Sequence, residues 1–565
     1  MTEGPQTPFA DNLHAEKYRG EGESFREYAN RVAAALTDKD EFHEFRDILL
    51  RQSFLPGGRI QSAVGSTRDT TPYNCYVSGT IEDSLTDGQG SIMSRAKQAA
   101  RTMQMGGGIG YDFSTLRPRG AEIRKLGSRS SGPISFMGIF NAICQTIASA
   151  GHRRGAQMGV MRVDHPDIEE FIHAKQNSDS LTGFNVSIGV TDEFMLAVEN
   201  DSDFDLRFGG QTYRTVRARA LWDKIMRSTW DWAEPGVLFI DRINEMNNLR
   251  YCEEIVATNP CGEQPLPGFG ACLLGSFNMT KYVVRNHDIY EFDYLGFAKD
   301  IAPVVAAMDR VIDVARYPLY EQEKEAKSKR RMGLGVTGMA NAVEAVTGHK
   351  YGSVGYIREQ TKLLSILRNE TYRASAFLAK ERGAFPEFDA EEYLQGEFVQ
   401  TLPEDVRDLI REHGIRNSHL TSIAPTGTIS LTADNVSSGI EPVFAYSVDR
   451  TVQGFDGPVN YTIEDYGYKF FGVQGKTSQD VTAQEHIDVL CNAQELVDSA
   501  VSKTCNVSPD MPWDDFKDLY MRAWKLGAKG CTTFNPGGKR MGILKAKTEE
   551  PSSCRITEDG RRECE

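Results

Sequence analysis

The chain has 565 residues, of which 40% are hydrophobic, and carries a formal net charge of −15 with a pI near 5.3. This acidic balance argues against a nucleic-acid partner, because no long run of lysine and arginine offsets it. No apolar run approaches the ~20 residues of a membrane span, so we expect a protein without a membrane anchor, in the cytoplasm of a cell or of a viral host. The ten cysteines are too few for a disulfide scaffold and form no close Cys-x-x-Cys pair, so no metal site is predicted.

Residues 1–55 are predicted to form a short helical segment ahead of the main domain, because Tyr28, Val32 and Leu36 recur there at helical spacing. Over residues 56–544, strand and helix patterns alternate without a linker, which predicts one large α/β domain. Strands are predicted over 185–190 and 236–240, and helices over 361–382 and 513–526, which end at Gly383 and Gly527.

Three segments of the first half carry candidate functional groups. Cys75 precedes apolar strand-forming residues, which by itself is also typical of an inert buried thiol. The glycines of 106–110 allow the backbone to approach a ligand closely, or simply make a tight turn. In the loop 151–159, Arg153 and Arg154 lie between glycines, which is typical of a mobile loop that binds a phosphate or a base. The alternative is that the two adjacent arginines are simply solvated.

The most distinctive stretch is the loop 259–265, in which Cys261 stands between Asn259 and Glu263. Prolines at 260 and 265 and a glycine at 262 exclude a regular helix, so the thiol is held on a constrained loop. An amide can orient a substrate hydroxyl, a carboxylate can take its proton, and sulfur can do radical or nucleophilic chemistry. Cys272 follows eleven residues after Cys261. The alternative is a buried, unreactive cysteine beside a proline turn.

Two further segments lie near the C-terminus. Residues 424–430 offer hydroxyls and backbone amides in a turn, which could hold phosphate if a helix begins there. The polar segment 545–565 ends with Cys554 and Cys564, which predicts a mobile dithiol that carries electrons, unless the two are unrelated exposed thiols.

Taken together and in this order, the motifs resemble the catalytic subunit of ribonucleotide reductases over nearly the whole chain. The resemblance implies that Cys261 becomes a thiyl radical while Asn259 and Glu263 bind the ribose. It implies that Cys75 and Cys272 deliver two electrons to the substrate. Cys554 and Cys564 would then re-reduce this pair by thiol–disulfide exchange. The fold it implies is a ten-stranded α/β barrel of two five-stranded halves, with the radical-bearing finger loop at its centre.

The radical source follows from what the chain lacks relative to the family's subclasses. Thr532 and Thr533 stand where reductases with a separate radical subunit carry a tyrosine pair, and no glycyl-radical motif occurs near the C-terminus. The amino-acid sequence of residues 107–120 and 151–168 is similar to that of the adenosylcobalamin-dependent class, although no cobalamin-binding motif is visible. The alternatives are a catalytic subunit of the separate-subunit type with an unusual radical route, or a catalytically silent nucleotide-binding homologue.

The resemblance also implies partners and further site residues. A ribonucleoside di- or triphosphate is the expected substrate, a deoxynucleotide the effector, and thioredoxin or glutaredoxin the reductant. A homodimer is expected because the chain lacks the insertion by which monomeric relatives mimic a partner. Effector contacts are assigned to Asp83 and Arg117, and substrate contacts to Asn74, Arg153, Arg154, Gln157, Pro425, Thr426, Gly427 and Thr428.

Overall fold

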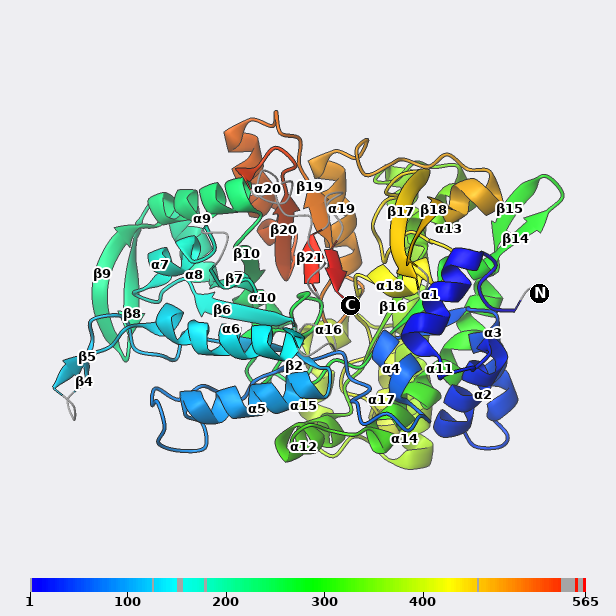
Figure 1. The fold of residues 1–565 in the computed structure, drawn as a ribbon, viewed down its shortest axis with the longest axis horizontal. Helices are drawn as coiled ribbons and strands as arrows, with labels where there is room; N and C mark the ends of the chain where they lie inside the picture. The colour runs from blue at the N-terminus through cyan, green and yellow to red at the C-terminus, as the bar shows by residue number, and fades with distance from the viewer. Residues whose placement is uncertain are drawn as a thin grey trace.

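The computed structural model describes residues 3–123, 127–149, 156–176, 180–454, 457–539, 554–556 and 562–564. Within these ranges, none of the helices combines the length and the apolar character that crossing a membrane requires. Figure 1 shows a mixed α/β protein in which the N-terminal helices lie at one end and the long hairpin β8 (Asp203–Phe208) and β9 (Gln211–Arg217) at the other.

Three helices precede the first strand. They are α1 (Pro8–Tyr18), α2 (Phe25–Leu36) and α3 (Phe42–Leu50). Ser24 and Glu27 form a capping box that fixes the start of α2, and the apolar stripe of this helix faces α3 and the long helix α11 (Tyr294–Val314). The helical spacing of the sequence therefore reflects a real packing face.

Within the described ranges, the larger sheet has seven strands. Five neighbouring strands of this sheet are parallel to one another. At the end of this set, the strand that contains Val237 pairs in antiparallel fashion with the strand that contains Cys531. The order across the sheet is β19 (Thr504–Asn506), β20 (Gly530–Phe534), β10 (Gly236–Phe239), β7 (Phe184–Val190), β6 (Gln157–Arg162), β3 (Gly108–Asp112) and β2 (Cys75–Val77).

A second sheet contains β1 (Phe54–Pro56), β13 (Leu274–Asn278) and β16 (Gly333–Thr337), with β13 and β16 parallel. Isolated bridges connect both of its sides to the larger sheet. Tyr76 of β2 pairs with Ala271, just before β13. On the other side, Leu334 pairs with Thr421, and Ile423 pairs with Val501, just before β19. The two sheets are thus linked at both edges.

Helices cover these sheets. The predicted helix over 361–382 is α14 (Val354–Arg382), which begins seven residues earlier because Ser353 caps it, and ends at Gly383 as expected. The predicted C-terminal helix is α20 (Trp513–Lys525). The others are α4 (Gly58–Ala63), α5 (Ile92–Gln104), α6 (Pro133–Ser149), α7 (Ile168–His173), α8 (Asp192–Glu199), α9 (Ala218–Trp232), α10 (Ile240–Glu245), α12 (Tyr320–Lys329), α13 (Met339–Thr347), α15 (Ala390–Leu394), α16 (Glu397–Gln400), α17 (Glu404–His413), α18 (Gly427–Leu431) and α19 (Ala483–Gln494).

Short antiparallel pairs complete the fold. Near the C-terminus, β21 (Cys554–Ile556) pairs with β22 (Arg562–Cys564), and β22 lies against α18. The rest of the predicted tail, 545–565, lies outside the described residues. The remaining pairs are β4 (Glu122–Ile123) with β5 (Ser128–Arg129), β11 (Ala257–Thr258) with β12 (Pro265–Leu266), β14 (Val283–Asn286) with β15 (Ile289–Phe292), and β17 (Ser447–Gly454) with β18 (Gly457–Glu464).

Candidate active site

The loop that carries Cys261 is the tip of the β11–β12 hairpin. Asn259 holds the loop closed by hydrogen bonds to other loop residues. Its backbone N–H donates to the carbonyl of Gln264 at 3.1 Å. Its side-chain Oδ1 accepts from the N–H groups of Gly262 at 3.1 Å and Gln264 at 3.0 Å. Gly262 has a φ of 83°, which glycine adopts without strain. The loop is therefore held by its own amide, which places Cys261 and Glu263 at its tip.

Two glycines of the segment 106–110, Gly108 and Gly110, pass close to this hairpin. A Cβ on Gly110 would lie 2.0 Å from the carbonyl oxygen of Thr258. A Cβ on Gly108 would lie 3.1 Å from the sulfur of Cys75 and 3.3 Å from the ring of Pro260. A side chain at Gly110 would therefore overlap the hairpin backbone, and one at Gly108 would require its neighbours to shift slightly.

Cys75 and Cys272 lie opposite each other on antiparallel segments. The Tyr76–Ala271 bridge sets this register, and the N–H of Cys272 donates to the carbonyl of Cys75 at 2.8 Å. Directly opposed, hydrogen-bonded residues have Cα atoms about 5.5 Å apart, a separation that disulfides commonly span. Both are free, buried thiols here. The structure thus brings together the two thiols that the sequence separates by almost 200 residues.

The surroundings of the pair keep both thiols protonated. Burial and, to a smaller extent, the Glu263 carboxylate raise the pKa of Cys75 to about 12, while the Asn259 amide and Arg59 act in the opposite direction. Burial also holds the pKa of Cys272 well above its usual range, with Cys75 and Glu263 adding to the effect. The carboxylate is therefore close enough to both sulfurs to influence them. A pair in this state holds two hydrogen atoms that it can give up.

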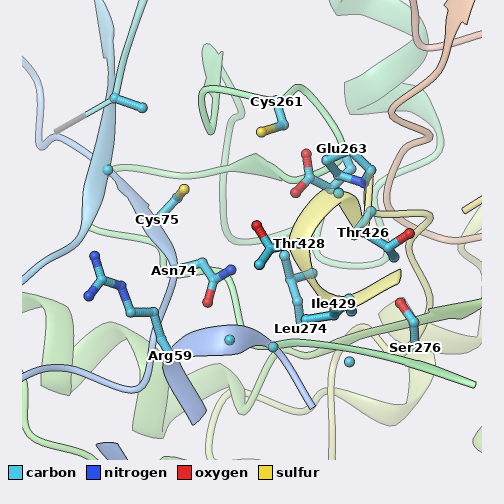
Figure 2. Close-up of a pocket in the computed structure, with 18 of the residues that line it drawn as sticks. Arg59, Asn74, Cys75, Cys261, Glu263, Leu274, Ser276, Thr426, Thr428 and Ile429 are labelled. Atoms are coloured by element: carbon cyan, nitrogen blue, oxygen red, sulfur yellow. The ribbon is translucent and has the colours of Figure 1, made fainter. Parts of the chain in front are cut away.

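A cavity of about 910 Å³, its mouth included, opens in front of these groups. Figure 2 shows the sulfurs of Cys75 and Cys261 and the carboxylate of Glu263 converging on one space, with the Thr428 hydroxyl facing them. This volume includes space that is open to solvent, so the cavity can be entered from outside. Its walls include the predicted residues Asn74, Pro425, Thr426, Gly427 and Thr428, together with Tyr18, Arg59 and Ser276, which the sequence did not indicate.

The turn 424–430 contributes one wall. As the sequence analysis required, a helix begins there, since α18 starts at Gly427. Thr426 has a φ of 51°, and its Oγ1 accepts from the N–H of Gly439 at 2.7 Å and lies 3.0 Å from the hydroxyl of Thr337. The hydroxyl of Thr426 thus holds the turn in shape, while Gly427 and Thr428 begin the helix at the cavity wall.

Cys261 also borders a second, smaller cavity of about 360 Å³, the space open to solvent included. Thr532, Ser502 and Gly530 belong to its lining, so it lies between the hairpin tip and strands β19 and β20. Cys261 therefore lies between the two cavities and lines both of them. Its sulfur is in a disulfide in this structure, and none of the seven free cysteines of the described part is the partner. Any radical chemistry at this sulfur requires its reduction first.

Other predicted site residues lie elsewhere. Gln157 is buried and does not line the large cavity, because its Oε1 accepts from the Tyr111 hydroxyl at 2.9 Å and its Nε2 donates to the Phe140 carbonyl at 3.3 Å. In this structure its side chain is engaged with Tyr111 and Phe140, and a contact with substrate stays a prediction. Asp83 and Arg117 form an ion pair of 2.7 Å that borders neither cavity. Arg153 and Arg154 lie outside the described residues.

Comparison with known proteins agrees with this geometry. The family model of the ribonucleotide reductase barrel domain matches residues 73–468 and 468–534. The chain belongs to the ribonucleotide reductase family. It is 33% identical over 579 residues to a vitamin B12-dependent ribonucleoside-diphosphate reductase of Mycobacterium tuberculosis, a match that covers 95% of this chain and 80% of that protein.

Two more distant relatives carry similar names. A vitamin B12-dependent ribonucleoside-diphosphate reductase of Thermoplasma acidophilum is 32% identical over 562 residues, which is 93% of this chain and 69% of the relative. A vitamin B12-dependent ribonucleotide reductase of Streptomyces clavuligerus is 27% identical over 627 residues, which is 96% of this chain and 64% of the relative. The similarity to all three therefore extends over nearly the entire chain.

Proposed function

We propose that this protein reduces ribonucleotides to 2′-deoxyribonucleotides by radical chemistry at Cys261, with cobalamin as its cofactor. The observation that carries the proposal is the position of Cys261 between two cavities. A substrate can occupy one side and a radical source the other, so a single sulfur can connect them. The relatives' names favour a ribonucleoside diphosphate as the substrate and adenosylcobalamin as the form of the cofactor.

The large cavity supplies the groups that reduction of a ribose needs. The Cys261 radical takes the 3′-hydrogen atom of the ribose, Glu263 accepts the 3′-hydroxyl proton, and Asn259 orients the ring. The Asn259 side-chain amide is close to the substrate's electron donors, since it forms a hydrogen bond with the Cys75 thiol. Cys75 and Cys272 give two electrons and two protons, so the 2′-hydroxyl leaves as water and the thiols become a disulfide. The hydrogen atom then returns from Cys261 to C3′.

The small cavity suits the cofactor's reactive end. Adenosylcobalamin, when bound, supplies a carbon-centred radical that can take the hydrogen atom of a thiol. The residues present fit such a group, because Thr532 is small and because Ser502 offers a buried hydroxyl without a partner among the described residues. The chain's own part is to expose Cys261 to this side while keeping substrate on the other.

We also propose that the two linked sheets are the halves of a ten-stranded barrel. One half is the parallel set β2, β3, β6, β7 and β10, and the other is β20, β19, the segment 421–423, β16 and β13. The antiparallel junctions at β10–β20 and at Tyr76–Ala271 support this reading, because they are where two oppositely directed halves would meet. The β11–β12 hairpin would then be the finger loop at the centre.

The tail is proposed to pass electrons to the buried pair. The register of β21 and β22 sets Cys554 opposite Cys564, which is the arrangement a reversible disulfide needs. Since β22 lies against α18, the tail reaches the wall of the substrate cavity. Thioredoxin or glutaredoxin would reduce it from outside, in the cytoplasm. A homodimer and a deoxynucleotide effector near Asp83 and Arg117 complete the proposal.

One assay tests the main claim. The reduced full-length protein should convert ribonucleotides anaerobically with adenosylcobalamin and dithiothreitol alone. Activity that requires a second protein and does not respond to cobalamin would refute it. The Cys261→Ser variant should bind substrate and make no product, because oxygen does not replace sulfur as the hydrogen-abstracting atom.

A further inference from the structure

The large cavity has two sides that differ in their chemistry. Figure 2 shows Arg59 next to Cys75 on one side, while Glu263 and Thr426 lie on the opposite side. Among the described residues that line this cavity, Arg59 carries the only basic side chain and Glu263 the only acidic one. The reaction proposed above gives Arg59 no role, so its place in the cavity wall is unexplained.

The position of the Arg59 guanidinium group depends on a glycine. Arg59 is the second residue of α4, and a Cβ on Gly106 would lie 2.6 Å from the guanidinium carbon. The guanidinium group therefore packs directly against the backbone of Gly106, whose φ of 92° favours glycine. Burial raises the pKa of Cys75 and the Arg59 charge opposes this, so the guanidinium group lies within electrostatic reach of the thiol.

The order of the atoms in a ribonucleotide decides which part of the substrate meets Arg59. In the proposed reaction, Cys261 acts at C3′, and Cys75 with its partner thiol reduces C2′. C3′ adjoins C4′, which leads to the 5′-phosphates, whereas C2′ adjoins C1′, which carries the base. The base therefore extends past Cys75 toward Arg59, and the phosphates extend to the opposite side. Ala156, which directly follows the arginines of the loop predicted to bind a phosphate or a base, lies on the same side, since a Cβ on Gly108 would be 3.1 Å from both the Ala156 carbonyl and the Cys75 sulfur.

We propose that Arg59 contacts the base of the substrate and favours guanine and uracil over adenine and cytosine. The inference rests on the proposed function and adds a residue that discriminates between its substrates. A guanidinium group donates hydrogen bonds and accepts none, so it binds carbonyl oxygens and unprotonated ring nitrogens. Guanine offers O6 beside N7, and uracil offers O4, whereas adenine and cytosine carry amino donors at the corresponding positions.

Competition between two substrates measures this preference independently of the amount of active enzyme. Equimolar guanosine and adenosine diphosphates are reduced together, anaerobically and without an effector, by the reduced full-length protein with adenosylcobalamin and dithiothreitol. For Arg59→Ala and Arg59→Lys, the ratio of deoxyguanosine to deoxyadenosine product should fall about tenfold, because the pair of donors to O6 and N7 is lost. Inosine diphosphate, which keeps O6 and N7, should lose as much as guanosine diphosphate. The diphosphate of 2,6-diaminopurine riboside, with an amino group at position 6, should behave like adenosine diphosphate.

Arg51 provides the matched control. It pairs with Asp300 at 3.0 Å and does not line the large cavity. Arg51→Ala should therefore lower the unfolding midpoint in denaturant and leave the product ratio unchanged.

Binding is measured separately from turnover. Calorimetric titration without cofactor should show that Arg59→Ala loses affinity for guanosine diphosphate and keeps its affinity for adenosine diphosphate. Equal losses for all bases in both experiments would overturn the inference, since a contact to phosphate does not depend on the base. Selective binding by a wild-type protein that makes no product with cobalamin would instead count against the proposed function alone.

Discussion

Two pairs of buried thiols occupy this protein, and they differ in what surrounds them. Cys75 and Cys272 lie on opposed antiparallel segments beside Glu263 and a cavity. Cys505 and Cys531 lie on the parallel strands β19 and β20, where they are hydrogen-bonded to each other with Cys491 nearby. The second pair belongs to the large hydrophobic core.

Burial alone therefore does not separate a working pair from a packing pair. Burial raises the pKa of Cys75 to about 12 and that of Cys491 to about 12 as well. The distinguishing features are a carboxylate and an amide beside the first pair, and the larger cavity that Cys75 lines, whereas Cys531 borders only the smaller one. Four changes would break or sharpen this contrast.

The largest effect is expected for the first pair. Cys75→Ser and Cys272→Ser each remove one of the two thiols that must form the disulfide, so deoxyribonucleotide formation should fall by at least about a thousandfold. Product is measured by chromatography after anaerobic turnover with dithiothreitol. A variant that keeps more than a tenth of the wild-type rate would contradict the assignment.

Glu263→Gln comes next. The amide keeps the shape of the side chain but cannot accept the 3′-hydroxyl proton, so kcat should fall roughly 10²- to 10⁴-fold, with a much smaller change in KM. Steady-state kinetics separate the two parameters. A rise in KM at constant kcat would instead assign Glu263 to substrate binding.

A conditional effect is expected for the tail. With thioredoxin as the sole reductant, the Cys554→Ser/Cys564→Ser double variant should stop after roughly one product per site, because a protein cannot reach the buried pair. With dithiothreitol it should continue, because a small dithiol diffuses into the cavity. Unimpaired turnover with thioredoxin would show that the tail cysteines are not needed to re-reduce the buried pair.

The smallest effect is expected for the second pair. Cys505→Ala should leave turnover within about twofold of wild type and lower the free energy of unfolding by about 1 kcal/mol, through lost packing. Activity and denaturant unfolding are measured on the same preparation. Loss of activity without loss of stability would give this pair a role in the reaction.

The sequence predicted the hairpin tip because prolines, a glycine, a thiol, an amide and a carboxylate coincide within seven residues. It could not predict Arg59, Ser276 or Ser502, since each reaches a cavity only through tertiary packing of distant segments. The position of Gln157 next to a basic loop gave no sign that its side chain turns inward to Tyr111. The family resemblance supplied the pairing of Cys75 with Cys272, which spacing alone would not have given.

The close passage of β3 under the hairpin has a consequence for variation in this protein. A side chain at Gly110 would overlap the Thr258 carbonyl, and one at Gly108 would crowd both Cys75 and Pro260. In a saturation scan of viable substitutions, position 110 should tolerate almost no change and position 108 only small side chains, although neither touches a reacting atom through a side chain. The positions that tolerate no substitution would therefore include residues that pack against the hairpin as well as residues that take part in the reaction.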